Sequence, residues 1–257
     1  MDMLDNDREG ELQISWYGRC CFLVELNNKK ILFDPYDRYC NVDIGLIDAD
    51  LLISSSTWHD HGHIGASPGA WIFTYPGSEV NGEFRITGIE AKENRGSPTV
   101  VFNVRYKNMS ITNFADLGAK GDKEFDKSLT PAQREVLRST NIAFMRPSIE
   151  GEEILENNIH DEKVLKYCSP NIIFPEHFFP GSFINEQVPD AKKEEFLKPN
   201  IIVDEMFSTL GYPVEEIDDY KVLVGLDKLA DKKTIYKLLR LHPQVKYTLE
   251  TSIPKRW

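Results

Sequence analysis

The 257-residue chain contains few cysteines and no long apolar run. Its four cysteines include no CxxC pair, and the adjacent Cys20 and Cys21 cannot easily bridge each other. Together with Cys40 and Cys168 they are expected to be buried, reduced thiols, as in cytoplasmic proteins. No apolar segment approaches the roughly 20 residues that span a bilayer, and residues 1–10 resemble no signal peptide. The sequence therefore predicts a cytoplasmic protein with no membrane partner.

Basic residues are also scarce, with 30 Lys and Arg against 41 Asp and Glu and a formal net charge of −11. A nucleic-acid partner is excluded, because phosphate backbones require a basic face. A small charged substrate is not excluded, because only the local field of a pocket acts on it. We expect a small-molecule substrate, and the sequence leaves open whether the chain forms a homo-oligomer.

Short segments rich in β-branched and aromatic residues fill the first half of the chain and predict strands. They are 12–16, 20–25, 29–35, 50–54, 71–75, 84–89, 99–106 and 109–114, with another at 171–175. Asn27-Asn28 and Asn81-Gly82 predict turns. With no linker or repeat in the sequence, we expect one α/β domain over residues 1–257.

Helical patterns are confined to the second half of the chain. Thr130 and Pro131 are typical of an N-cap and a first helical residue. Further helices are expected around 160–167 and 228–241, and the charged stretch 190–196 is expected to be a solvated helix or loop.

The most informative segment is STWHDHGH at residues 56–63, directly after the apolar strand Leu51–Ile53. It places His59, Asp60, His61 and His63 within five positions, and His177 ends a second apolar segment, IIFPEH. Imidazole and carboxylate are the usual ligands of zinc and similar ions. Loops at the ends of buried strands commonly carry functional groups, so the pattern predicts a metal site.

Four segments of the chain occur in the order typical of one family. They are ISWYGRCCFLVELNNKKILFDPY at 14–36, ADLLISSSTWHDHGH at 49–63, NFADLG at 113–118 with TPAQ at 130–133, and IIFPEH at 172–177. They resemble the metallo-β-lactamase-fold hydrolases, most closely the branch that includes L-ascorbate-6-phosphate lactonase. The resemblance implies a four-layer αββα sandwich with a core at 12–180 and a C-terminal extension at 181–257.

The resemblance also assigns ligands, and it implies that half of the family's metal site is missing. The family's HxHxDH motif falls on residues 56–61, so Ser56 and Trp58 replace its first two histidines, while Asp60 and His61 match. The loop with the family's next histidine corresponds to EAKENRG at 90–96, which offers Lys92 or Glu93 instead.

The second metal position of the family is retained in the sequence. Asp116 matches the bridging aspartate and His177 matches the last histidine, so the resemblance implies one divalent ion (Zn, Mn or Fe) held by Asp60, His61, Asp116 and His177. A register shifted onto His59, His61 and His63 is an alternative, but it requires two offsets. In the unshifted register, His59 and His63 flank the site without binding the ion.

Three residues stand at the vacated first position, namely Ser56, Trp58 and Lys92. The indole of Trp58 would fill the space of an imidazole, and the ammonium of Lys92 would replace the charge of an ion. The ordinary alternative is that Trp58 packs in the core and Lys92 is exposed to solvent. Arg146, in FMRPS, could bind an anionic substrate group or pair with one of the acidic residues.

Two functions follow from this pattern. The first is a metal-dependent hydrolase that cleaves a small ester, lactone or phosphoester, with Asp60 and Asp116 as catalytic carboxylates and an ion that activates water. The second is a catalytically inactive homologue that binds no metal and serves as a binding or scaffolding protein. The sequence keeps both open, because pocket loops vary on a common fold.

Overall fold

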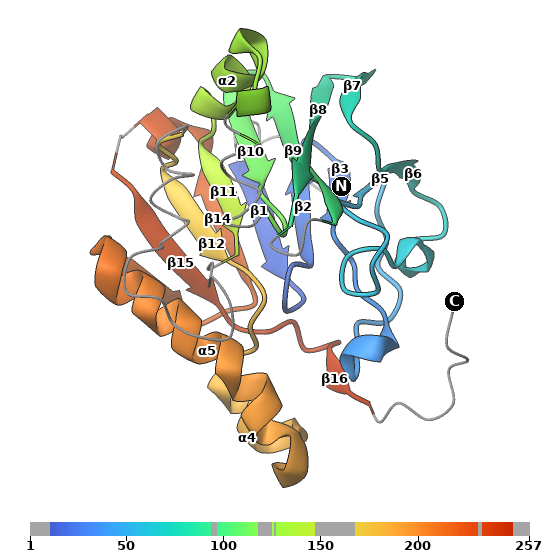
Figure 1. Ribbon diagram of the computed structural model, residues 1–257, viewed down its shortest axis with the longest axis vertical. Helices are drawn as coiled ribbons and strands as arrows, with labels where there is room; N and C mark the ends of the chain where they lie inside the picture. Colours follow the sequence, from blue (N-terminus) through green and yellow to red (C-terminus); the bar gives the residue numbers. More distant parts are fainter. Residues whose placement is uncertain are drawn as a thin grey trace, which may run out of the picture.

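The computed structural model describes residues 11–93, 97–117, 125, 127–146, 168–230 and 233–248, and it consists of two packed β-sheets with helices outside them (Figure 1). The first sheet has the strand order β14-β1-β2-β3-β5-β6. Its strands are β1 (Glu11–Trp16), β2 (Phe22–Leu26), β3 (Lys29–Phe33), β5 (Leu51–Ile53), β6 (Trp71–Phe73) and β14 (Lys221–Gly225).

The second sheet has eight strands in the order β13-β15-β12-β11-β10-β9-β8-β7. They are β7 (Gly77–Asn81), β8 (Phe84–Lys92), β9 (Pro98–Tyr106), β10 (Met109–Asn113), β11 (Ile142–Met145), β12 (Ile172–Pro175), β13 (Val214–Ile217) and β15 (Ile235–Leu239). A small ladder joins β4 (Val42–Asp43) to β16 (Lys246–Tyr247).

Apolar side chains between the two sheets form the main core of the sandwich. The ring of Phe22, on β2, stacks on the ring of Phe144, on β11, with centroids 4.2 Å apart and an interplanar angle of 2°. Both residues are buried, as are Phe33 and Phe174 beside them. These strands are buried on both faces: Phe22 and Phe144 pack in the main core, and their neighbours Leu23 and Ala143 pack in the clusters on the outer faces.

Helices cover the outer faces of the sheets. Helices α4 (Gly181–Gln187) and α5 (Asp190–Leu210) contribute Phe183, Ile184 and Phe196 to a second apolar cluster with Leu23 and Leu32 of the first sheet. Helix α2 (Pro131–Arg138) lies at the opposite end of the molecule in Figure 1 and places Leu137 in a third cluster on the second sheet.

Parallel strands bring several loops to one edge of the sandwich. In the first sheet β3 pairs parallel with β5, and in the second sheet β11 pairs parallel with both β10 and β12. The carboxyl ends of parallel neighbours lie at the same edge of a sheet. The residues that follow these strands therefore lie close together. They are Asp34, the 54–63 loop, Asp116, Arg146 and His177.

The structure confirms the predicted α/β sandwich and the strands of the first half of the chain. The turns at Asn27-Asn28 and Asn81-Gly82 join β2 to β3 and β7 to β8, with φ of 50° and 58° at the two asparagines of the first turn. Helix α2 begins after Thr130 as expected, and the charged stretch 190–196 lies within α5.

The helix predicted at 228–241 is wrong. A 3₁₀ segment ends at Ala230, and Ile235–Leu239 forms β15, between β12 and β13. The expected helix at 160–167 lies outside the described residues. The predicted extension at 181–257 supplies strands to both sheets, β14 to the first and β13 and β15 to the second. Within the described residues, no helix combines the length and the apolar character that a bilayer crossing requires.

Candidate metal centre

The site is built around the contact between Asp34 and His61, both fully buried. Asp34 follows β3 with φ +40°, and its carboxylate accepts hydrogen bonds from the Ser55 backbone N–H (2.6 Å), the Ser55 hydroxyl (2.8 Å) and the Asn113 amide (2.7 Å). Its Oδ2 also lies 3.1 Å from Nδ1 of His61. A carboxylate at one ring nitrogen fixes the orientation of an imidazole and leaves the other nitrogen for a ligand.

The other nitrogen of His61 faces two aspartates. His61 Nε2 lies 2.8 Å from Asp116 Oδ2 and 3.9 Å from Asp60 Oδ2. The ligand atoms of these three residues all lie within 4.8 Å of one another. The structure thus brings together Asp60, His61 and Asp116, three of the four residues expected as ligands.

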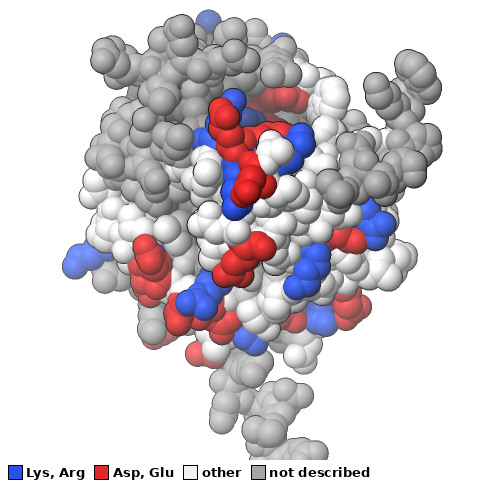
Figure 2. Space-filling view, turned by 90° about the horizontal axis from the view of Figure 1, so that it is seen from below, with Lys and Arg blue, Asp and Glu red and all other residues white. Residues whose placement is uncertain are grey.

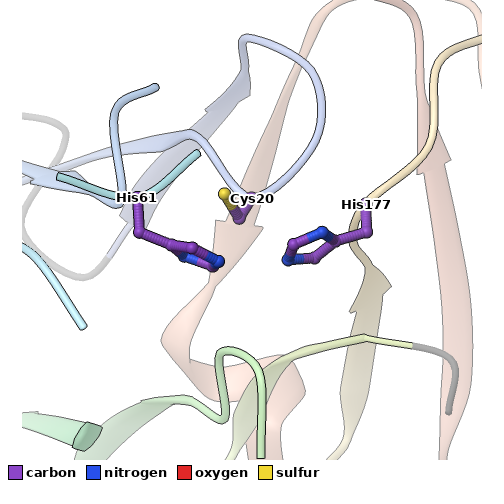
Figure 3. Close-up of side chains that lie close together, drawn as sticks. All are labelled: Cys20, His61 and His177. Atoms are coloured by element: carbon purple, nitrogen blue, oxygen red, sulfur yellow. The ribbon is translucent and has the colours of Figure 1, made fainter. Parts of the chain in front are cut away.

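His177, the fourth expected ligand, comes directly after β12 and reaches the same point. Its ring centroid lies 5.1 Å from that of His61, and its Nε2 lies 3.2 Å from Asp116 Oδ1 but has no hydrogen-bond partner. Figure 3 shows the two imidazoles pointing toward each other, with Cys20 beside them. The sulfur of Cys20 and one nitrogen of each histidine lie within 4.8 Å of one another, so the thiol is a further donor close to the site.

Two arginines pair with the site carboxylates. Arg19, in the loop between β1 and β2, places Nη2 3.2 Å from Asp60 Oδ2. Arg146, directly after β11, donates from Nη1 to Asp116 Oδ1. Arg146 therefore lies in the site as the sequence suggested, paired with an acidic residue, while Arg19 was missed because one arginine in a hairpin has no diagnostic neighbours.

The electrostatics of the two histidines differ. Burial opposes a charge on His61, but the neighbouring Cys20, Asp116 and Asp34 outweigh it and raise the pKa of His61 well above its ordinary value. Burial lowers the pKa of His177 well below its ordinary value, with Arg146 acting in the same direction. The His177 imidazole is therefore neutral and can offer its Nε2 lone pair, whereas a cation at His61 would displace a proton.

The carboxylates of the site are held in the charged form. Burial alone would raise the pKa of Asp116, but that pKa is held well below its ordinary value, with His61 and Arg146 acting against burial. The pKa of Asp60 is also lowered, with His61 and Arg19 acting against burial. Both aspartates are ionised at neutral pH and can act as oxygen ligands.

Two glutamates lie near the site: Glu93, which the sequence offered with Lys92 in place of the family's loop histidine, and Glu176, which was not predicted. Glu176 is fully buried, neither of its carboxyl oxygens has a hydrogen-bond partner, and burial followed by Asp34 raises its pKa well above the ordinary value. Burial, Asp116 and Asp60 raise the pKa of Glu93. The only sequence clue to Glu176 was an acidic residue between Pro175 and His177 in an otherwise apolar segment.

The remaining candidates lie around the site rather than in it. His59 is exposed, with its ring 5.9 Å from that of Tyr39, and the half-buried His63 lines a surface cavity of about 400 Å³ with Tyr36 and Asp37. Of the three histidines in the 56–63 segment, only His61 joins the described ligand groups. The structure therefore favours the unshifted register.

The residues expected at the vacated first position do not fill a buried space. Trp58 is 53% exposed, Lys92 is exposed at the end of β8, and the half-buried Ser56 accepts a hydrogen bond from the Trp58 backbone N–H (3.3 Å). The indole thus does not occupy the place of an imidazole. Among the described residues of that loop, Glu93 is electrostatically coupled to Asp116 and Asp60.

The donor set fits one divalent cation. Zinc bonds of about 2.0 Å in a tetrahedron place ligand atoms about 3.3 Å apart. Three distances in the site lie on either side of this value. They are 2.8 Å from His61 Nε2 to Asp116 Oδ2, 3.2 Å from His177 Nε2 to Asp116 Oδ1 and 3.9 Å from His61 Nε2 to Asp60 Oδ2. The buried, unpartnered Nε2 of His177 supports the same conclusion, because an imidazole nitrogen without a partner is costly unless a ligand uses it.

Comparison with known families agrees with this architecture. The family model described as "Beta-lactamase superfamily domain" matches residues 13–133. Over this range the chain is similar to the metallo-β-lactamase superfamily, and its fold is the metallo-β-lactamase fold. The matched range contains the histidine segment and Asp116 but ends before Arg146 and His177. It does not distinguish among the branches of the superfamily, so the similarity to the lactonase branch stays a prediction.

Solved structures of this superfamily have the same fold. One, from Thermotoga maritima, is described as a candidate Zn-dependent hydrolase of the metallo-β-lactamase superfamily; it is 20% identical, with a TM-score of 0.60, over 89% of this chain and 100% of that one. Another, the metallo-β-lactamase fold protein YhfI from Bacillus subtilis, is 9% identical, with a TM-score of 0.52, over 92% of this chain and 99% of that one. None of the curated proteins matches the sequence.

Proposed function

We propose that this protein is a member of the metallo-β-lactamase superfamily and a metal-dependent hydrolase with one metal position, which acts on a small ester, lactone or phosphoester. The observation that carries the proposal is that three separate loops bring Asp60, His61 and Asp116 together and place His177 Nε2 3.2 Å from Asp116 Oδ1. The similar Thermotoga maritima structure, described as a candidate Zn-dependent hydrolase, supports the same class of chemistry.

The residues of the chain have distinct roles in this proposal. When bound, a divalent cation lowers the pKa of water toward ~7 and polarises a carbonyl or phosphoryl oxygen. Asp60, with one-fifth of its side chain exposed, is placed to accept a proton from an attacking water, and Asp116 is the buried second carboxylate. Asp34 holds His61 in the orientation that the site needs.

The chemistry of the donors limits the identity of the ion. Two imidazoles and two carboxylates suit zinc, manganese or iron, whereas calcium and magnesium prefer sites built from oxygen alone. The nearby thiol of Cys20 favours zinc further, because sulfur is a soft donor. We therefore propose zinc as the first ion to test.

The alternative function is that of a catalytically inactive homologue with a binding or scaffolding role. One observation favours it: guanidinium groups already pair with both candidate carboxylate ligands, Arg19 with Asp60 and Arg146 with Asp116. Such pairs can neutralise a cleft without an ion. The two functions therefore differ in whether the purified protein holds a metal.

Metal content separates these functions. We would measure zinc, manganese and iron by mass spectrometry in full-length protein purified without an affinity tag, as wild type and as His177→Ala. His242→Ala, which changes a histidine that stacks on Tyr17 outside the site, is the matched control. About one equivalent in wild type and control, lost in His177→Ala, supports the hydrolase. No metal in any of the three overturns it and favours the binding role.

A further inference from the structure

We propose that Arg19 and Arg146 form an oxyanion-binding pair that takes the place of the missing first metal position. The substrate then carries a carboxylate or phosphate group beside the bond that is cleaved. This inference rests on the proposed function, because it names the substrate class of the same site. It differs from a two-metal site in that guanidinium groups supply the positive charge that a second ion would provide.

The two oxygens of Asp116 carry the first part of the argument. Oδ2 faces the retained half of the site, 2.8 Å from His61 Nε2, and Oδ1 accepts from Nη1 of Arg146. In the family that the chain resembles, this aspartate bridges two ions. Here one of its oxygens has a guanidinium as a neighbour, and Ser56 and Trp58 supply no imidazole for a second ion.

Arg19 is the second member of the pair, and hydrogen bonds hold its backbone in place. Its backbone N–H donates to the carbonyl of Phe178 (3.1 Å), its own carbonyl accepts from the indole of Trp16 (3.1 Å), and its φ is +49°. Nη2 donates to Asp60, but Nε is buried without a hydrogen-bond partner. A buried donor left unpaired is costly, so an acceptor from a ligand would stabilise this arrangement.

The charge of the loaded site also favours an anion. Three carboxylates, of Asp34, Asp60 and Asp116, surround His61, and two guanidiniums pair with two of them. With the Cys20 thiol protonated, a divalent cation added to this set leaves one positive charge in excess. An anionic substrate group would balance that excess and would lie between the cation and the arginines.

Both guanidinium groups can be reached from solvent. The side chains of Arg19 and Arg146 are 24% and 43% exposed, while Asp116 behind them is 10% exposed. Figure 2 shows basic and acidic side chains lying side by side on the face of the molecule seen from below. The exposed fractions of Arg19 and Arg146 thus make two guanidinium groups accessible on a chain whose net charge is −11, and the local field acts on the substrate.

The planar fork of arginine makes the pair specific for oxyanions. A guanidinium presents several N–H groups in a fixed plane, which matches two oxygens of a carboxylate or phosphate, whereas a lysine ammonium is a point charge. A substrate oxyanion would exchange with the carboxylates of Asp60 and Asp116 as the acceptor of these N–H groups. Those carboxylates are then the ligands of the cation.

The test is calorimetric titration of the zinc-loaded, full-length protein with orthophosphate and, separately, with succinate. Trimethyl phosphate, which has no charge, controls for shape. We expect Arg19→Gln and Arg146→Gln to weaken binding of at least one anion tenfold or more. Arg138→Gln, an exposed arginine on α2 that pairs with Glu135, is the matched control and should bind as wild type does. Preference for one anion identifies the substrate group as phosphate or carboxylate.

Two further measurements keep the result interpretable. Zinc content, measured on every variant, must stay at about one equivalent, because zinc itself attracts anions and its loss would mimic an arginine effect. Arg146→Lys retains the positive charge but lacks the planar guanidinium, so it should bind the anion more weakly than wild type. Equal anion binding by wild type and both glutamine variants, at equal zinc content, overturns the inference.

A failure of the proposed function gives a different result. If the wild type takes up no zinc, the one-metal hydrolase is overturned, and the same titrations on the metal-free protein decide the role of the arginines. Arginine-dependent binding there supports an oxyanion site alone. Binding that is absent, or independent of both arginines, overturns the oxyanion pair as well.

Discussion

Asp34 Oδ2 lies 3.1 Å from His61 Nδ1, and this contact directs Nε2 of the same ring toward Asp116, 2.8 Å away. The two aspartates come from different sheets, since Asp34 follows β3 and Asp116 follows β10. His61 therefore spans the space between the sheets at their common edge. The orientation of one buried imidazole depends on side chains more than 20 residues away on either side.

Asp34→Asn should weaken zinc binding by about 10- to 100-fold, the usual effect of removing the partner of a metal-bound imidazole. The amide has the shape of the carboxylate but lacks the charge that holds His61. Competition titration with a chromogenic chelator measures the affinity. Asp48→Asn, at a carboxylate 89% exposed and paired with Lys30, is the control. An affinity equal to that of wild type would show that Asp34 does not orient His61.

Cys20 should contribute sulfur to the bound ion. Burial raises the pKa of this thiol to about 12, so the thiolate forms only when a cation stabilises it. In protein loaded with Co²⁺, we expect a near-ultraviolet charge-transfer band that disappears in Cys20→Ser. Cys21→Ser, at the adjacent cysteine buried in the apolar cluster with Leu23 and Leu32, should keep the band. Stoichiometric Co²⁺ without the band would exclude Cys20 as a ligand and leave the metal site intact.

Glu176→Gln should stabilise the metal-free protein increasingly as pH rises. The pKa of Glu176 is raised above its ordinary 4.5, chiefly by burial, so its contribution to stability is complete below pH 4.5 and is lost as pH rises through the folded-state pKa. Glutamine does not titrate and avoids this loss. Urea unfolding from pH 4 to 8 measures the difference.

The variant should thus match wild type near pH 4 and exceed it in free energy of unfolding near pH 8. Glu186→Gln, which removes an exposed carboxyl group on α4, is the control. A difference between Glu176→Gln and wild type that stays constant with pH would contradict the raised pKa of Glu176.

Thr130→Ala should lower the free energy of unfolding by about 1 kcal/mol, the usual cost of losing an N-cap side chain. The Thr130 hydroxyl accepts from the Gln133 backbone N–H (3.2 Å), and the Gln133 amide oxygen accepts from the Thr130 backbone N–H (2.8 Å). Chemical denaturation measures the change. Thr74→Ala, at an exposed threonine outside any helix, should change stability little. Equal values for both variants would show that this cap adds nothing to stability.

Local sequence predicted the elements whose own side chains decide their conformation. β-branched and aromatic residues predicted β8, β9 and β10. The paired asparagines predicted the turn between β2 and β3, and Thr130-Pro131 predicted the start of α2. Residues 228–241 were mispredicted because their apolar spacing suits a helix as well as a strand. Parallel pairing of Ile235 and Tyr236 with β12 selects the strand, and that pairing is a tertiary interaction.

For the site, the sequence by itself determined the ligand types and the order of motifs, and so indicated Asp60, His61, Asp116 and His177. Only the tertiary structure decided that His61 rather than His59 or His63 is buried with the aspartates, that Trp58 is exposed, and that Arg19, Asp34, Cys20 and Glu176 surround the same point. The physical reason is that these contacts join residues far apart in the chain. They depend on the register of two packed sheets, which local patterns do not encode.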